Sequence, residues 1–154
     1  MRFSPALKHK IHALCIESVE QKLDLIRKAI SDTREALTVE SKSSAGDKHE
    51  TARAMLQLET EKRSEQLVQS LNLQEALNKI HLTEISADNI HIGTLVHTSV
   101  GIFYIAVGIG KLNYDGKEYM AISAASPIAH AMIGKKKGDT VELNDRKIDI
   151  INVT

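Results

Sequence analysis

The sequence predicts an α+β fold: an N-terminal antiparallel helical hairpin followed by a small β-rich domain with one short helix. Two long segments, from Lys8 to about Val39 and from Asp47 to about Ile80, contain no Gly or Pro, which is typical of long helices. After about Thr83, short β-branched stretches alternate with turn residues. We therefore expect two domains, at residues 1–80 and 83–154.

Length and composition exclude several classes of protein. A chain of 154 residues holds one ordinary domain or two small ones. Lys plus Arg equal Asp plus Glu at 20 each, so the net charge gathers neither nucleic acid nor an anionic membrane. We expect no sequence-specific DNA binding and no membrane contact. The charged start lacks the apolar stretch of a secretory signal, which predicts a cytoplasmic location.

The first helical segment carries the apolar seam of a coiled coil, with residues spaced alternately by three and four. The polar stretch 40–46 interrupts it before the second segment begins, and an antiparallel hairpin is the economical interpretation. The second arm has a thin seam, because the stretch 59–66 is polar. The seam residues of the first arm are Ile16, Val19, Leu23, Ile26, Ile30, Thr33 and Leu37.

Turn residues divide the second half into strands. Asp115-Gly116 predicts one tight hairpin, and the stretch 144–146 predicts another near the end of the chain. A short helix is expected from Pro127 to Ile133, with Ser126 as its N-cap and Gly134 as its stop. The expected strands are 90–96, 101–109, 111–114, 117–122, 140–143 and 147–153.

The sequence does not indicate a zinc site, a reactive cysteine or a prolyl-isomerase pocket. His9 and His12 share a helical face but have no carboxylate or Cys partner at metal spacing, which argues against zinc. Cys15 lies among apolar helical residues and is interpreted as a packing residue. The second half has few aromatic residues to line a prolyl-isomerase pocket.

One segment carries a family resemblance. The stretch 126–139, Ser-Pro-Ile-Ala-His-Ala-Met-Ile-Gly-Lys-Lys-Lys-Gly-Asp, resembles the C-terminal signature of the Gre-type (GreA/GreB-like) transcript-cleavage factors. The order of parts, a helical hairpin before an FKBP-like β domain, is also similar to that family. At the hairpin turn Gly46 precedes Asp47 and Glu50, which fall on the two acidic tip positions of the family.

The resemblance implies a bacterial elongation factor that enters the secondary channel of RNA polymerase. There it would stimulate cleavage of backtracked nascent RNA at its 3′ end, while the polymerase remains the enzyme. Asp47 and Glu50 would hold a second Mg²⁺ shared with the polymerase active site, and this chain alone would bind the ion weakly. The expected polymerase-docking residues are Ser126, Pro127, Lys135, Lys136, Lys137, Gly138 and Asp139.

Alternatives remain open at the tip. Asp47 followed three residues later by Glu50 is also a capping box, and both roles can coexist. The tip departs from the family pattern, because Thr51 replaces a usual Asn and Arg53-Ala54 replaces an acidic residue and a Tyr. A second hypothesis is therefore a non-cleaving channel binder that inhibits the polymerase. A third, a coiled-coil adaptor unrelated to transcription, is disfavoured by the C-terminal signature.

Overall fold

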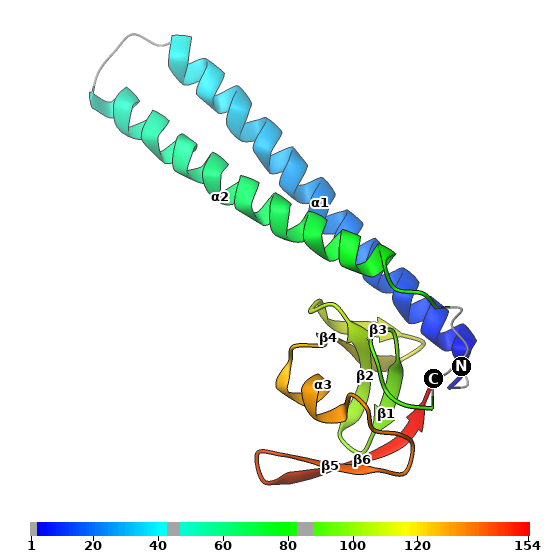
Figure 1. Ribbon diagram of the computed structural model, residues 1–154. Helices are drawn as coiled ribbons and strands as arrows, with labels where there is room; N and C mark the ends of the chain where they lie inside the picture. The colour runs from blue at the N-terminus through cyan, green and yellow to red at the C-terminus, as the bar shows by residue number, and fades with distance from the viewer. Residues whose placement is uncertain (1–2, 43–46, 83–87) are drawn as a thin grey trace. The chain divides into compact units, whose positions relative to one another are not determined.

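The structure, a computed structural model, describes residues 3–42, 47–82 and 88–154, but not the side chains of residues 40–42 and 47. Two long helices, α1 (Pro5–Lys42) and α2 (Asp47–Asn78), precede six strands and one short helix (Figure 1). The predicted α+β fold class is confirmed. By contacts the chain divides into two compact units, one of Val19–Gln74 and one that joins Met1–Ser18 to Glu75–Thr154.

The unit Val19–Gln74 is the paired part of the two helices. The α1 seam is buried from Val19 to Thr33 and half-buried at Ile16 and Leu37, whereas the facing part of α2 is polar in its middle. There the half-buried Arg63 donates from Nε to Glu59 Oε1 at 2.9 Å and from Nη1 to Gln66 Oε1 at 3.1 Å. One turn beyond Gln66, the fully buried Ser70 hydroxyl has no hydrogen-bond partner among the described residues. The hairpin is therefore held mainly by apolar side chains of α1.

The second unit is built on a six-stranded mixed sheet with the order β3-β4-β2-β1-β6-β5. The pairing of β2 with β4 is parallel and the other pairings are antiparallel. The hairpins expected at Asp115-Gly116 and at 144–146 correspond to β3–β4 and β5–β6. The strands are β1 (Leu95–Thr98), β2 (Gly101–Ala106), β3 (Gly110–Tyr114), β4 (Lys117–Ser123), β5 (Thr140–Leu143) and β6 (Arg146–Val153).

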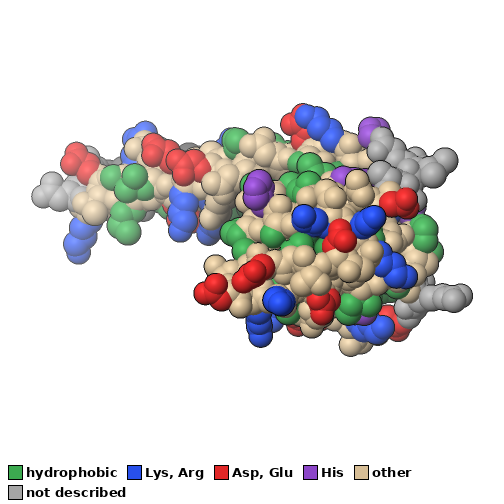
Figure 2. Space-filling view, turned by 60° about the horizontal axis from the view of Figure 1, so that its bottom comes forward, with side chains coloured by type: hydrophobic (Ala, Val, Ile, Leu, Met, Phe, Trp, Pro, Cys, Tyr) green, Lys and Arg blue, Asp and Glu red, His purple; other side chains and the backbone are tan. Residues whose placement is uncertain are grey.

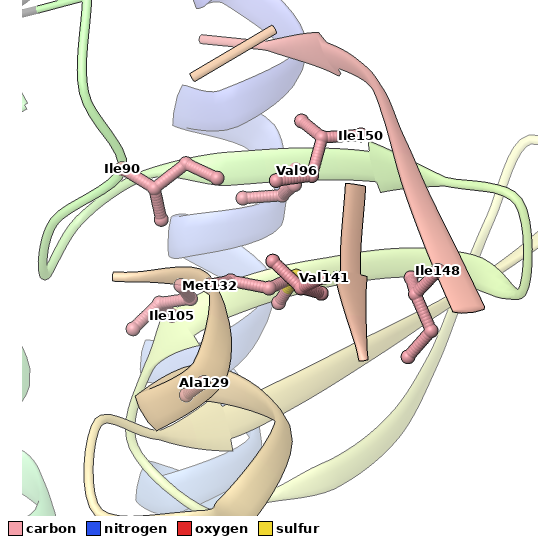
Figure 3. Close-up of a cluster of buried hydrophobic side chains, with 8 residues drawn as sticks. All are labelled: Ile90, Val96, Ile105, Ala129, Met132, Val141, Ile148 and Ile150. Carbon is pink, nitrogen blue, oxygen red and sulfur yellow. The ribbon is translucent and has the colours of Figure 1, made fainter. Parts of the chain in front are cut away.

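The helix α3 (Pro127–Met132) closes an apolar core on one face of this sheet. Ala129 and Met132 of α3 are fully buried in it against side chains of the strands (Figure 3). Burying a side chain of the size of Val, Ile or Met stabilises a fold by roughly 1.5 to 3 kcal/mol. The core consists of Ile90, Val96, Ile105, Ala129, Met132, Val141, Ile148 and Ile150.

The opposite face of the sheet is covered by the first turns of α1. Leu95 and Tyr104 are register partners in β1 and β2, and both are fully buried. His12 of α1 reaches this face, where its Nδ1 lies 2.6 Å from the Tyr104 hydroxyl oxygen. The apolar residues of α1 beside His12 are also buried, namely Leu7, Ile11 and Cys15. The N-terminal turns of α1 thus form part of the core of the β domain.

Two strand expectations are wrong in detail, and one of them is the strand expected over 101–109, because β2 ends at Ala106. A strand was expected over 90–96, but β1 begins only at Leu95. The preceding segment pairs instead with the loop after α3, since Ile90 N donates to Lys135 O at 2.7 Å and Gly134 N donates to Ile90 O at 2.8 Å. A turn with Gly93 at φ +94° then leads into β1. Among the described residues, no helix is long and apolar enough to cross a membrane.

Candidate functional site

The two acidic tip positions lie in the first turn of α2. Asp47 is the first residue of that helix and Glu50 follows three residues later with an exposed side chain. Side chains three residues apart on a helix are neighbours, with Cβ atoms about 5 to 6 Å apart. The turn residue Gly46 and the side chain of Asp47 lie outside the described part of the chain. The backbone therefore brings the two carboxylate positions to one helical turn.

A shallow, open groove lies beside this turn. It is lined by Lys48, Thr51, Ala52 and Met55, all on the first turns of α2. The Met55 side chain is largely exposed, so its apolar surface is available to a partner. The groove offers one cation and one apolar side chain next to the acidic positions.

The donor set at the tip limits which metal it could hold. The described residues contain no group of three or more His, Cys, Asp or Glu side chains able to hold a metal ion. Magnesium prefers oxygen ligands, keeps several waters and is commonly held by one or two carboxylates together with substrate phosphate. Two carboxylate positions on one helical turn offer fewer protein ligands than a complete magnesium site needs.

At the start of α3, the expected docking residues also shape the helix. The Ser126 hydroxyl accepts from Ala129 N at 3.4 Å and donates to Ser123 O at 2.7 Å, so Ser126 is the N-cap. Pro127 occupies the first helical turn, where its missing N–H costs nothing, and its side chain is exposed. Pro127 is thus accessible to a partner, whereas Ser126 is largely used by the fold.

In the loop after α3, some residues fix the backbone and others present exposed charges. Gly138 has φ +93°, which favours glycine, and its N–H donates to Ile150 O at 2.9 Å. The Asp139 carboxylate accepts from Lys136 N at 2.9 Å and closes the loop. The side chains of Lys135, Lys136 and Lys137 are exposed on this fixed loop. The structure therefore presents three ammonium groups there, and Gly138 and Asp139 hold the backbone.

Sequence reasoning missed one buried polar pair, His12 and Tyr104. Their rings meet edge to face with centroids 5.9 Å apart. Burial, and next the charge of His9, lowers the pKa of His12, while burial raises the pKa of Tyr104. Burial also raises the pKa of the nearby Cys15 thiol to about 12, so that the thiol stays protonated. The position of His12 among Leu7, Ile11 and Cys15 in the sequence was the available signal.

These features define a class of protein that combines a helical hairpin with a mixed-sheet domain. The hairpin has two acidic positions in the first turn of its second helix, and the sheet domain has a short helix with an N-cap. Residues 107–154 match the family described as "Transcription elongation factor, GreA/GreB, C-term". This part of the chain is therefore similar to the C-terminal domain of the GreA/GreB elongation factors.

Two relatives support this assignment. The chain is 40% identical over 68 residues to the transcription elongation factor GreA of Bradyrhizobium diazoefficiens, a match that covers 42% of this chain and 43% of that protein. It is 38% identical over 73 residues to GreA of Rickettsia canadensis, covering 44% and 43% respectively. The matches thus span less than half the length of each relative. No solved structure matches the chain significantly.

Proposed function

We propose that this protein binds RNA polymerase and stimulates the polymerase to cleave backtracked nascent RNA. The single observation that carries the proposal is the match of residues 107–154 to the GreA/GreB C-terminal domain. The acidic positions 47 and 50 on the first turn of α2 add the chemistry that such a factor needs. The protein would act in the cytoplasm, and the polymerase would remain the enzyme.

In this mechanism the hairpin carries Asp47 and Glu50 into the secondary channel, beside the RNA 3′ end. One carboxylate would ligate Mg²⁺ together with groups of the polymerase, and the other would orient the attacking water. A second magnesium at such a site supplies charge stabilisation for an in-line phosphodiester displacement. The two positions lie on one helical turn of α2, so both carboxylates would be able to serve the same ion.

Docking would be the task of the β domain. The exposed Pro127 and the lysines Lys135–Lys137 lie at the two ends of α3 and offer a rigid contact surface. Because Ser126, Gly138 and Asp139 fix the backbone of this surface, substitutions there would weaken docking indirectly, through its shape. The nascent RNA would be reached only through the polymerase.

A second candidate function is inhibition of the polymerase by the same insertion, without cleavage. Arg53 and Ala54 favour it, because both side chains are exposed one turn after Glu50. A cation there would partly neutralise the acidic pair, and Ala54 offers no ring to contact a base.

The test uses purified polymerase stalled on a template, with shortening of the RNA 3′ end as the readout. The double variant Asp47→Asn, Glu50→Gln should lose most cleavage stimulation, because neutral amides are poor magnesium ligands and cannot act as bases. It should keep its melting temperature, since Asn and Gln also cap helices. Glu61→Gln, Glu65→Gln makes the same charge change at exposed positions of α2 and should cleave as wild type does.

The outcomes separate the candidates. Cleavage by the Asp47→Asn, Glu50→Gln variant at the wild-type rate would show that these side chains only cap α2. Binding of the wild-type protein with slower elongation and no shortened RNA would favour inhibition. Absence of any binding to polymerase would remove both functions.

A further inference from the structure

Four large apolar side chains of the hairpin lie outside its seam. They are Leu25 and Val39 on α1 and Met55 and Leu58 on α2, and they are between 64% and 70% exposed. Isolated exposed apolar residues are common on protein surfaces, so their exposure alone indicates nothing. These four are not scattered, however, because their positions place them on one side of the hairpin.

The two residues on α1 belong to one row along that helix. Leu25 and Val39 each follow a seam residue by two positions, and a heptad repeat returns to the same side of the helix every seven residues. They lie about 21 Å apart along the axis, since each residue of a helix adds about 1.5 Å. Between them the row contains Ala29 and Ala36, whose small side chains let another helix approach closely.

The two residues on α2 form a second row, which adjoins the first. Met55 and Leu58 lie on the same side of α2 as Gln66 and Gln69, because the helix turns once in about 3.6 residues. A cavity between the helices joins this side of α2 to the row on α1. Its lining residues are Lys22, Leu25, Ile26, Arg63, Gln66 and Gln69. The two rows therefore form one surface of the hairpin, which we call the apolar flank (Leu25, Val39, Met55 and Leu58).

The charges in these two rows are nearly balanced. They belong to three lysines and two carboxylates, all of them exposed, and none of the five makes an ion pair with another described residue. Such a surface favours neither a polyanion nor a strongly basic partner. A second copy of the same surface presents both signs, so that each charge can meet its opposite. The five residues are Lys22, Asp32, Lys48, Lys62 and Glu65.

We propose that the apolar flank is the contact surface for a second copy of this chain, so that two hairpins pair side by side as a four-helix dimer. In a two-fold symmetric pair, α1 of one copy faces α2 of the other, which brings Asp32 of one copy toward Lys62 of its partner. Association removes four exposed apolar side chains of each copy from water. The flank is therefore complementary to itself in both apolar surface and charge.

The dimer also bears on the acidic positions at the tip. The apolar flank reaches Met55, two turns of α2 beyond Asp47 and Glu50. A dimer that covers this flank has to separate before a single hairpin enters a narrow channel. This consequence rests on the proposed function, whereas the dimer itself does not.

The test is sedimentation velocity of the full-length protein from micromolar to millimolar concentration, where the wild-type protein should shift from monomer to dimer. Leu25→Gln, Leu58→Gln should raise the dissociation constant of the dimer by roughly tenfold or more, because it removes central apolar contacts from both rows. Glutamine keeps a helix propensity close to that of leucine, so circular dichroism should show unchanged helix content.

Val68→Gln, Leu71→Gln is the matched control. Both residues are exposed on α2, at 57% and 38%, but they lie roughly a third to a half of a helical turn away from the centre of the row of Met55 and Leu58. This variant should change the dissociation constant by less than about twofold.

A charge exchange tests whether the flank is complementary to itself. Lys62→Glu alone should weaken the dimer, because it places a like charge near Asp32 of the other copy. Asp32→Lys, Lys62→Glu should recover part of the lost affinity. A variant that merely destabilised the hairpin would show no such recovery.

A wild-type protein that stays monomeric up to millimolar concentration would overturn the inference. Equal dissociation constants for wild type and Leu25→Gln, Leu58→Gln, or an equal loss in the control variant, would show that the flank is not the contact. If wild type forms no dimer and Leu25→Gln, Leu58→Gln loses binding to core RNA polymerase, the flank contacts that partner and the inference is wrong. Because sedimentation uses no polymerase, the dimer can fail while the proposed function holds, and the reverse.

Discussion

His12 illustrates how a single buried side chain can make the stability of this protein depend on pH. Its ring is buried between α1 and the sheet and bonds to the Tyr104 hydroxyl at 2.6 Å. Burial and the nearby His9 lower the pKa of His12 below its ordinary value of 6.5. The folded state therefore favours the neutral ring, while the unfolded state takes up a proton at higher pH.

We predict that the free energy of unfolding falls as the pH drops below about 6.5, because the unfolded chain binds more protons there. The stabilisation is complete above the unfolded pKa and is lost as the pH falls through the lowered folded pKa. His12→Gln should flatten this dependence, whereas the exposed His130→Gln should leave it unchanged. The measurement is the urea midpoint between pH 5 and pH 8, and equal slopes for wild type and His12→Gln would contradict the assignment.

Ser70 supplies a second test at a single residue. Its hydroxyl is fully buried and has no partner among the described residues. Replacing it with Ala removes a buried polar group, which should raise the free energy of unfolding by about 1 kcal/mol. Ser64→Ala on the exposed face of the same helix reports the gain in helix propensity alone, about 0.5 kcal/mol. Equal gains from the two substitutions would show that Ser70 is satisfied in solution.

Local chemistry explains which residues could be predicted from the sequence. Ser126 and Pro127 begin α3 as predicted, because capping and proline preferences act within one turn. His12 and Ser70 could not be assigned, because burial depends on packing between segments far apart in sequence, as the contact of His12 with Tyr104 shows. The acidic positions 47 and 50 were placed on one turn by spacing alone, and their role stays a prediction.

At the level of elements, periodicity and turn residues located most of the fold. Both long helices, α3 and the two antiparallel hairpins were predicted close to their observed limits. The expected strand over 90–96 was wrong because Ile90 finds its partners in the loop after α3. The parallel pairing of β2 with β4 was not predicted, since no local signal encodes which distant strands meet.

The first turns of α1 lead to a prediction about fragments. Sequence analysis predicts that residues 83–154 fold alone, whereas the compact unit of the structure also contains residues 1–18. We expect the fragment 83–154 to bind a hydrophobic dye, because Leu95 and Tyr104 lose their cover. A peptide of residues 1–18 should suppress that binding, and the same peptide with Ile11→Asp should not. A fragment that unfolds cooperatively without dye binding would support the sequence-based boundary.

For the whole molecule, charge gives no net attraction to a polyanion. Lys and Arg balance Asp and Glu at 20 each, and Figure 2 shows the two signs interspersed on the face that it presents. Long-range steering by net charge would therefore contribute little to the proposed encounter with polymerase. Recognition of the proposed partner would then come from local surfaces such as the exposed lysines 135–137 after α3.

We expect the free protein to bind magnesium weakly. Two carboxylates on an exposed helix turn leave most of the six magnesium positions to water, so we predict a dissociation constant in roughly the millimolar range. Titration calorimetry with MgCl₂ measures this directly. Asp47→Asn, Glu50→Gln should abolish the weak signal, and Glu61→Gln, Glu65→Gln should not. Micromolar affinity in the wild-type protein would show that the chain holds a complete magnesium site of its own.

The pairing of β1 with β6 affects how the chain folds while it is being synthesised. Thr154 exchanges two backbone bonds with Leu95, of 2.7 and 2.9 Å, so the sheet closes only after residues 146–154 have been synthesised. The hairpin can form on the ribosome as soon as α2 has emerged. The apolar residues Leu7, Ile11 and Cys15, by contrast, are covered only once the sheet has formed. Until then they would be exposed to chaperones and to neighbouring nascent chains. Slow translation of the C-terminal half would lengthen that exposure and would favour aggregation through the N-terminal turns.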